Sequence, residues 1–444
     1  MQCVKMLLAS VFVYLPALSS AQAAGFIEDS HASVKLRNFY SRQTTHRTTA
    51  LVIQKPSGNQ LTDERTTWIQ AAMLEVRSGY TQGFFGLGVD ASLFAATPLE
   101  RGHGAIANGG DRTLVNHNGD AVSEWSRLAV ADIRLRASHT ELKVGRMMVE
   151  NPMLRVKDNR SLPSSFEGAG VLSTDLGGIT LQAGMFDRVI PRTGTGAEKL
   201  VSTYGSRAVS GDNLSYLGAT LDPWHGLQAS VYYSRFEDVW SRYYLGLTHR
   251  AGSVETLAFK QVFTLYHTDD QGRRELGYID NTFASLASTL SHGAHSFTLA
   301  YQQVFGDEYF DFPWETSANY AANSAYSDFN GPNEKSVQVR YDIDAAGYGI
   351  PGLTAGLWYI RGWGIDGTHY RGDREGANAG YNVRGLDGAK HRELGLTAGY
   401  VLQSGRMKGS SLRTIVFHHR ATPGQVDGSY DELRLVTTVP FEVF

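Results

Sequence analysis

The chain has 444 residues, of which 41 are Lys or Arg and 44 are Asp or Glu, giving a formal net charge of −3 at pH 7. This balance does not favour nucleic-acid binding, because domains that bind DNA or RNA carry a marked excess of basic residues. The single cysteine, Cys3, lies in a predicted leader, so the rest of the chain has no disulfide, thiolate metal site or cysteine nucleophile. Many glycines (48) and few prolines (12) suit a fold of strands joined by turns.

The first residues are typical of a secretory signal peptide. Lys5 precedes an apolar run over residues 6–18, and a small-residue cleavage motif follows at 21–23. The apolar run is too short to span a bilayer as a helix, and no run of about 18 apolar residues occurs after it. We therefore expect an exported protein with a leader over 1–23 and one domain over 24–444.

After the leader, the polarity of the side chains alternates. Val34 and Leu36 alternate with Ser33, Lys35 and Arg37, and a period of two predicts a strand, because successive side chains point to opposite faces. In a soluble sandwich the two cations would face bulk water. In an outer-membrane barrel the apolar side faces lipid and the cations line an aqueous channel.

The same alternation recurs along the chain, over 128–138, 177–184, 335–344 and 431–438. In the first of these segments, Ala129, Ile133 and Leu135 share the predicted apolar face, and Arg134 and Arg136 lie on the other. Short turn signals alternate with longer polar stretches, such as those over 102–120 and 370–389. Short turns at one end and long loops at the other are typical of an outer-membrane barrel.

These patterns predict an all-β fold, a transmembrane antiparallel β-barrel of about 18 strands, with 16 as the neighbouring option. Arginines occur singly in the middle of the alternating segments, where they would be costly on a lipid face and without purpose in a dry core. The chain also ends in phenylalanine, as many outer-membrane barrels do. A secreted β-sandwich or β-helix is the alternative.

Catalytic motifs are absent from the sequence. The segment GYGIPG over 347–352 has the glycine spacing of a nucleotide-binding loop, but it contains a proline and precedes a strand-like segment, which indicates a turn. His418 and His419 are adjacent, so they would point to opposite faces of a strand and could not ligate one metal ion. His391 and Glu393 share a face, but no third ligand can be identified. The sequence therefore predicts no enzyme, no cofactor and no metal site.

Basic side chains are the remaining candidates for function. For any one of them, a solvated face or an ion pair is the expected role. As a set lining one lumen, they would form a cationic track for carboxylates, which a guanidinium binds through two parallel hydrogen bonds. The candidates of this kind are Lys35, Arg37, Arg42, Arg134, Arg136, Arg340, Arg413 and Arg434.

The segment GFIEDSHASVKLRNFYSRQ resembles the mature N-terminus of the OprD family of substrate-specific porins of pseudomonads. The resemblance continues through LKVGRMMVENP, YSDFNGPNEKS, YGIPGLTAGLWYIRGWGIDGT and DELRL, and it covers nearly the whole chain after the leader. It implies an 18-stranded monomeric barrel whose inward-folded loops constrict it to an eyelet. It also implies a ladder of basic residues on one wall, along which small carboxylate solutes diffuse.

The resemblance also implies roles for individual residues. The positions that resemble basic-ladder members are Arg42, Arg413 and Arg434. The positions that match the eyelet, opposite the ladder or beside it, are Tyr204, Tyr326 and Asp328. The stretch KDNRSLPSSF resembles the constricting third loop, which adds Arg160 as a candidate.

Three positions depart from the pattern of the family branch that takes basic amino acids. Gly399 stands where that branch has a ladder lysine, Ile415 where it has an arginine, and Phe312 where it has an eyelet tyrosine. A thinner ladder and a more apolar eyelet weaken the case for basic amino acids. They leave room for aromatic or other organic acids.

The sequence thus predicts a passive, substrate-preferring porin of the Gram-negative outer membrane for small organic acids or amino acids. The expected partners are outer-membrane lipid and lipopolysaccharide, small carboxylate solutes and, during biogenesis, the barrel-assembly machinery. No nucleic acid is expected, and the barrel would be a monomer or a weak trimer. The alternatives are an outer-membrane barrel enzyme of the protease or lipase type, and a structural or adhesive barrel.

Overall fold

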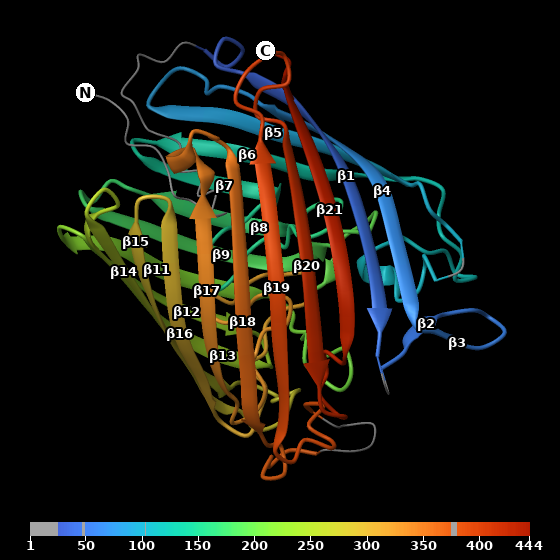
Figure 1. Cartoon of the computed structure of the whole chain (residues 1–444). Helices are drawn as coiled ribbons and strands as arrows, with labels where there is room; N and C mark the ends of the chain where they lie inside the picture. The colour runs from blue at the N-terminus through green and yellow to red at the C-terminus, as the bar shows by residue number, and fades with distance from the viewer. Residues whose placement is uncertain (1–24, 47–48, 103, 374–379) are drawn as a thin grey trace.

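The computed structural model describes residues 25–444 except 47–48, 103 and 374–379, so the predicted leader over 1–23 lies outside the described residues. In this part of the chain, 18 long strands form one closed antiparallel β-barrel (Figure 1). The barrel closes because β1 (His31–Thr45) pairs with β4 (Glu64–Arg77) on one side and with β21 (Tyr430–Glu442) on the other. The predicted fold class is confirmed.

The remaining long strands follow one another around the barrel, each paired with its neighbour. They are β5 (Phe85–Pro98), β6 (Trp125–Ala137), β7 (Thr140–Met147), β8 (Ser165–Ser173), β9 (Ile179–Ile190), β11 (Leu214–Trp224), β12 (Leu227–Phe236), β13 (Trp240–Ser253), β14 (Leu257–Asp270), β15 (Asp280–His292), β16 (His295–Phe305), β17 (Lys335–Asp344), β18 (Leu353–Ile365), β19 (Ala389–Val401) and β20 (Ser411–Ala421).

Short elements complete the described chain. β2 (Leu51–Ile53) and β3 (Gln60–Thr62) form a separate hairpin, and β10 (Glu198–Lys199) pairs with β9. The two described helices are the single 3-10 turns η1 (Gly109–Asp111) and η2 (Ala345–Tyr348). No described helix has the length and apolar character needed to cross a membrane.

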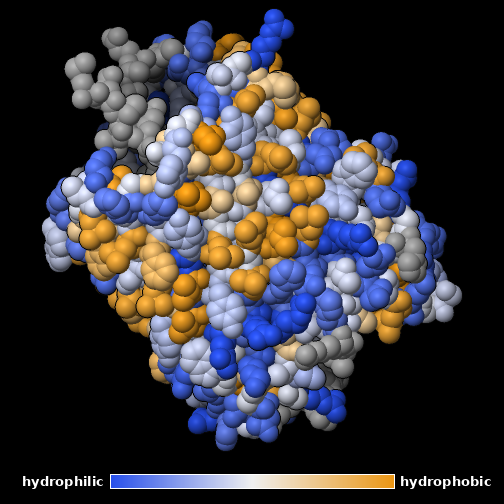
Figure 2. Space-filling view, viewed as in Figure 1, coloured by the Kyte–Doolittle hydropathy of each residue, from blue (hydrophilic) through white to orange (hydrophobic). Residues whose placement is uncertain are grey.

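Alternation sorts the side chains between the two faces of the wall. On β19, Leu394 and Leu396 are exposed on the outer face, whereas His391 and Glu393 are buried on the inner face. In the space-filling view, apolar residues gather across the middle of the wall, and hydrophilic residues dominate its lower end, where the long loops lie (Figure 2). An apolar belt around a polar interior is the arrangement that a barrel needs in lipid.

A β-bulge in β6 changes which of its residues share a face. Ser92 pairs with Val130 and the next residue, Leu93, pairs with Leu128, so Ala129 is the extra residue of β6. Ala129 is fully buried, whereas Ile133 is exposed on the outer face. The prediction that these two residues share a face was wrong, because a bulge changes the parity of the strand and sequence alternation does not reveal it.

The segment 347–352 is a turn, as predicted. It connects β17 to β18 through η2, and Gly349 and Gly352 have φ values of 80° and 90°, a region that favours glycine. The strand β18 begins directly afterwards, at Leu353. The position therefore lacks the helix that a nucleotide-binding loop requires.

The long loops fold into the barrel and pack against the inner face of its wall. A large cluster of buried apolar side chains combines strand residues with loop residues such as Met153, Leu154, Phe310, Tyr370 and Tyr381. The stretch over 370–389, expected to be a polar loop, contributes several of these buried side chains. The core of the molecule therefore lies inside the barrel, between the wall and the inward-folded loops.

The assignment of an outer and an inner face to each strand predicts how a new charge on either face changes the stability. Leu286 lies at the centre of β15 with its side chain on the outer face, and the neighbouring Ala287 has the opposite parity. We expect Leu286→Arg to lower the free energy of unfolding by about 2–4 kcal/mol, since the guanidinium would face hydrocarbon near the midplane. Ala287→Arg is the matched control and should cost much less. Urea unfolding in lipid vesicles measures both; equal losses would contradict the assignment of faces.

Candidate functional site

The constriction of the barrel is built where inward-folded loops meet. The β7–β8 loop over 148–164 and the β16–β17 loop over 306–334 touch through a bridge between Val156 and Thr316. The hydroxyl of Ser164 donates to the carbonyl of Glu315 (2.8 Å). The β9–β11 loop over 191–213 joins them through a bridge between Ser202 and Pro313. These contacts narrow the lumen from several sides.

Arg37 anchors the predicted third loop to the barrel wall. Its guanidinium donates to the two carboxylate oxygens of Asp158 (2.5 and 3.1 Å) and to the carbonyl of Arg160 (3.2 Å). Arg37 and Lys35 share the face of Ser41, which is fully buried and bonded to Glu432. Both cations therefore point into the lumen, as the outer-membrane interpretation of the alternation requires.

Buried arginines that the sequence did not single out hold the other loops. Arg192 binds Glu315 through two side-chain contacts (2.9 and 2.7 Å), and both residues are almost fully buried. Arg127, on β6, donates to backbone carbonyls of the β9–β11 loop, including those of Arg192 and Gly194. Because loops lack periodicity, nothing in the sequence pattern marked Arg192. Arg127 lies two residues after the start of β6 and just before the alternating segment 128–138, so that pattern did not include it.

Three predicted arginines lie on the lumen face of one part of the wall. Arg340 on β17 pairs with Asp342 (2.6 Å), and Arg434 on β21 pairs with Glu432. Arg413 on β20 makes one long contact with the hydroxyl of Thr397 (3.5 Å) and has no ion-pair partner among the described residues. Arg413 is also within electrostatic reach of Arg340 and Arg434.

The inward loops add further cations beside Arg434. Arg112 binds both oxygens of Glu432 (2.9 Å each), so this one carboxylate serves two arginines. Arg160 binds Asp111 (3.2 Å). Burial, helped by Arg112, lowers the pKa of Arg160 to about 9, against the opposing effect of Asp111. Burial alone would raise the pKa of Asp111, but Arg160 and Arg112 hold it well below its usual range.

Lys157, in the third loop, completes this group. Its ammonium has no ion-pair partner among the described residues, although Asp328 and Glu315 are near enough to act on it. Burial is the main effect that lowers the pKa of Lys157, and Arg192 adds to it. We call the following set the basic cluster: Arg112, Lys157, Arg160, Arg413 and Arg434.

The predicted eyelet residues lie beside the basic cluster. The hydroxyl of Tyr204 donates to Asp328 (2.8 Å), and its ring stacks on Tyr309 with the centroids 4.9 Å apart. The ring of Tyr326 lies 5.4 Å from the guanidinium of Arg434. Tyr326 therefore lies against the basic cluster, and Asp328 is near enough to Lys157 to act on its charge.

Arg42 is not brought into the lumen. It has the parity of Leu36 rather than that of Arg37, and it pairs with Glu64 (3.1 Å) with both side chains exposed. The expectation from the resemblance was wrong here, because the assigned position lies one residue away from the inner face of β1.

The other predicted cations face inward and contact partners outside the basic cluster. Lys35 pairs with Glu75 (2.9 Å), and Arg134 pairs with Asp90 (2.9 Å). Arg134 and Arg136 both lie over the ring of Tyr80, at 4.5 and 4.1 Å. Each of these three cations therefore already has a carboxylate or an aromatic ring as its neighbour.

Each of the three positions that depart from the family pattern adjoins a residue of the basic cluster or of the predicted eyelet. Gly399 is the cross-strand partner of Arg413, and Ile415 is the partner of Arg434. The ring of Phe312 meets the edge of Tyr204, with the centroids 5.7 Å apart. The departures therefore change the surface beside Arg413, Arg434 and Tyr204.

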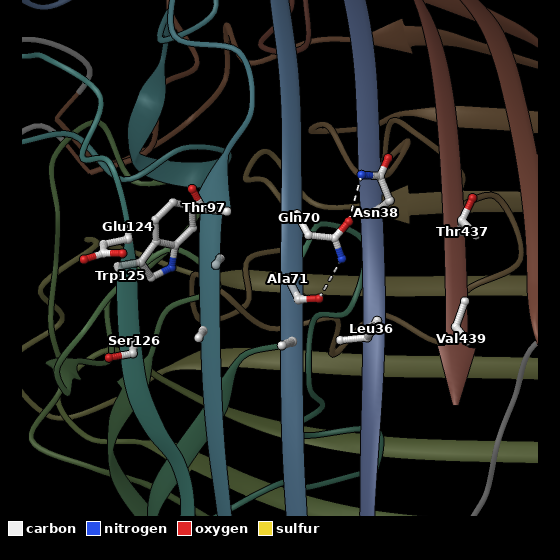
Figure 3. A pocket seen from close by; sticks show the side chains of 13 residues that line it. Leu36, Asn38, Gln70, Ala71, Thr97, Glu124, Trp125, Ser126, Thr437 and Val439 are labelled. Atoms are coloured by element: carbon white, nitrogen blue, oxygen red, sulfur yellow. Dashed lines mark hydrogen bonds between the residues drawn. The ribbon is translucent and has the colours of Figure 1, made fainter. Parts of the chain in front are cut away.

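A groove of about 950 Å³ lies on the wall across β21, β1, β4, β5 and β6, and outward-facing residues such as Leu36 and Asn38 line it (Figure 3). Small side chains, among them Ala72 and Ala95, make it shallow, and Gln70 accepts a hydrogen bond from Asn38 (3.0 Å). The groove faces away from the basic cluster, and we assign it no part in the constriction.

A substitution at Glu432 tests whether the buried ion pairs of the basic cluster stabilise the fold. In Glu432→Gln, the buried Arg112 and Arg434 lose their shared carboxylate, so we expect the free energy of unfolding to fall by about 3–5 kcal/mol. Glu64→Gln, which breaks the exposed pair with Arg42, is the control and should cost less than about 1 kcal/mol. Unfolding in urea, followed by tryptophan fluorescence, compares the two variants. Similar values would contradict the buried arrangement.

Comparison with known proteins places these features in context. Residues 24–443 match the family model described as outer membrane porin, OprD family. Porin D of Pseudomonas aeruginosa is 36% identical over 437 residues, covering 95% of this chain and 93% of the relative. The crystal structure of OccD3 (OpdP) from the same organism is 47% identical, with a TM-score of 0.83 and coverage of 96% and 94%. The structure of P. aeruginosa OpdK with vanillate is 27% identical, with a TM-score of 0.81 and coverage of 94% and 100%.

Proposed function

The chain belongs to the OprD family of outer membrane porins, and on that premise we propose that it is a passive channel selecting small carboxylate solutes at the basic cluster. Its place is the outer membrane of a Gram-negative bacterium. The named relatives are porins, which are channels and not enzymes. We also propose that residues 1–23 are removed as a leader and that 24–444 form the barrel unit.

The observation that carries the proposal is an excess of positive charge at the constriction. Within the basic cluster, the ion-paired carboxylates are Asp111 and Glu432, whereas Arg413 and Lys157 have no carboxylate partner among the described residues. A carboxylate that enters a narrow passage loses water, and free cations replace that hydration. The binding stays weak enough for release, because the cations are partly solvated and screened by salt.

The surroundings of the basic cluster favour organic acids with an apolar or aromatic body. Tyr204, Tyr309 and Phe312 form a packed aromatic surface beside the passage. Gly399 is the cross-strand neighbour of Arg413, and Ile415 is that of Arg434; neither carries a charge. The related OpdK, whose structure contains vanillate, an aromatic carboxylate, supports this class of solute.

Single-channel conductance in a planar bilayer tests the function. The purified protein is titrated with benzoate, arginine and a neutral sugar, and we expect saturable block by benzoate, none by the sugar, and block that weakens as salt rises. Block by arginine in place of benzoate would move the proposal to amino acids. A silent bilayer from a folded, heat-modifiable barrel would overturn the channel function and lead to assays for a barrel enzyme.

Arg413 provides the sharpest test of the carboxylate proposal. Because its side chain has no ion-pair partner, Arg413→Ala should leave the barrel intact while removing one solute contact. We expect the affinity for benzoate, measured from the block, to fall about tenfold, as the loss of a charge-assisted hydrogen bond would give. The matched control is Arg42→Ala on the outer face, which should leave the block unchanged. Equal block in the wild type and Arg413→Ala would remove Arg413 from the site.

A substitution at Gly399 tests whether an added positive charge strengthens benzoate binding. A Cβ at this position meets only the hydroxyl of Thr354 (3.4 Å) and the carbonyl of Leu412 (3.8 Å), so a longer side chain has room. We expect Gly399→Lys to tighten benzoate binding about fivefold, which corresponds to ~1 kcal/mol for a charge at close range in water. Gly399→Met controls for length without charge. Tighter binding in both variants would show that packing, rather than charge, is responsible.

A further inference from the structure

Three side chains with metal-binding atoms meet on the inner face of the barrel, although the sequence offered no third ligand. His391 lies on β19, His419 on β20 and Asp427 in the loop over 422–429. One ligand atom from each lies within 4.8 Å of the others. Both histidines are buried, and Asp427 is half-buried at the side of the group.

Each histidine is oriented by a contact at the nitrogen that faces away from the group. Nδ1 of His419 lies 2.6 Å from the carbonyl of Gly428, which can only accept, so Nδ1 carries the hydrogen. Nε2 of His391 lies 2.6 Å from the carboxylate of Glu334. An outward N–H held by a carbonyl or a carboxylate is the outer-shell arrangement that fixes metal-binding histidines.

The remaining nitrogens face each other. Nδ1 of His391 and Nε2 of His419 are 2.9 Å apart, the distance of a hydrogen bond in which one proton is shared. Two imidazole nitrogens bound at ~2.0–2.1 Å to a tetrahedral ion stand roughly 3.3 Å apart. An ion that replaces this proton therefore needs the two rings to part by a few tenths of an ångström.

Charge balance also suits a divalent cation at this position. Glu334 and Asp427 are the carboxylates next to the histidine pair, and Glu393 lies on the same face of β19. Asp427 in turn accepts from the hydroxyl of Ser327. Nitrogen and carboxylate ligands in a set of three are typical of zinc sites that keep one position open.

We propose that His391, His419 and Asp427 form a binding site for a divalent transition-metal ion, for which Zn²⁺ is the probe. The bound ion ties the β20–β21 loop to β19 next to Ser327, the neighbour of the eyelet residues Tyr326 and Asp328. This site is independent of the solute that the channel carries.

A second group of possible ligands supplies the control. His267, Asp269 and Asp280 also lie within 4.8 Å of one another, but they are more exposed. Nδ1 of His267 contacts the hydroxyl of Thr282 (2.9 Å) rather than a carbonyl or a carboxylate. This second group therefore lacks the pair of oriented histidine nitrogens that the group around His391 has.

Calorimetric titration of the chelator-treated, full-length barrel with ZnCl₂ in detergent tests the proposal. We expect one ion per chain, with binding lost in His391→Ala and in His419→Ala and unchanged in His267→Ala. Glu334→Gln, which removes only the charge that orients His391, should weaken binding by about 10–100-fold. Titration with Co²⁺ adds a spectroscopic check, since the visible absorption of a tetrahedral nitrogen–oxygen site should disappear in the same variants.

Two results would overturn the site: no Zn²⁺ bound by the wild type, or binding that persists in both His391→Ala and His419→Ala. If either histidine variant fails to form a heat-modifiable barrel, Asp427→Asn takes its place, because its loop position lies outside the strand pairing. Undiminished affinity in that variant counts against the site.

Discussion

The structure depends on closure of one sheet in a solvent that offers no hydrogen bonds. A strand edge facing hydrocarbon would leave a row of backbone amides and carbonyls unpaired, so the wall is stable only as a ring. Here the ring is completed by β1, which pairs with β4 along one edge and β21 along the other. Closure has two results. It gives each strand a lipid face and a wet face, and it provides an interior in which irregular loops can satisfy their polar groups away from lipid.

Charge in that interior takes two forms, which lie side by side in the basic cluster. Most of the buried arginines are structural: Arg192 with Glu315 and Arg112 with Glu432 hold loops in place, and removal of either partner would leave an uncompensated charge. A smaller number of cations, Arg413 and Lys157 among the described residues, have no carboxylate of their own. The fixed pairs hold the loops, and the unpaired cations are those to which we assign solute binding.

The sequence predicts the position of a residue well where that residue lies in a strand whose side chains alternate with a period of two. The segment 335–344 coincides with β17, because alternation is imposed by the wall itself. The resemblance also located Tyr204, Asp328 and Arg434 on surfaces that meet. Arg112, Lys157 and the ligand group around His391 could not be found in this way, since tertiary contacts between loops and neighbouring strands bring them together. Arg42 differs from these cases: counting from Arg37 already gives it the outer parity, so the alternation of this chain was a better guide than the alignment.

The contact between Ser41, Arg112 and Glu432 joins the first strand, a loop and the last strand of the chain. It can form only after β21 has docked on β1, at the end of assembly. Until then, the guanidinium of Arg112 lacks Glu432, and its loop is held to the wall by other contacts, such as the one from Arg65 on β4 to the carbonyl of Ala107 (3.0 Å). A chain that stops short of its C-terminal strand would therefore lose this contact together with the pairing that closes the barrel. The same few atoms that position the loop thus come into contact only when both ends of the barrel sheet are in place.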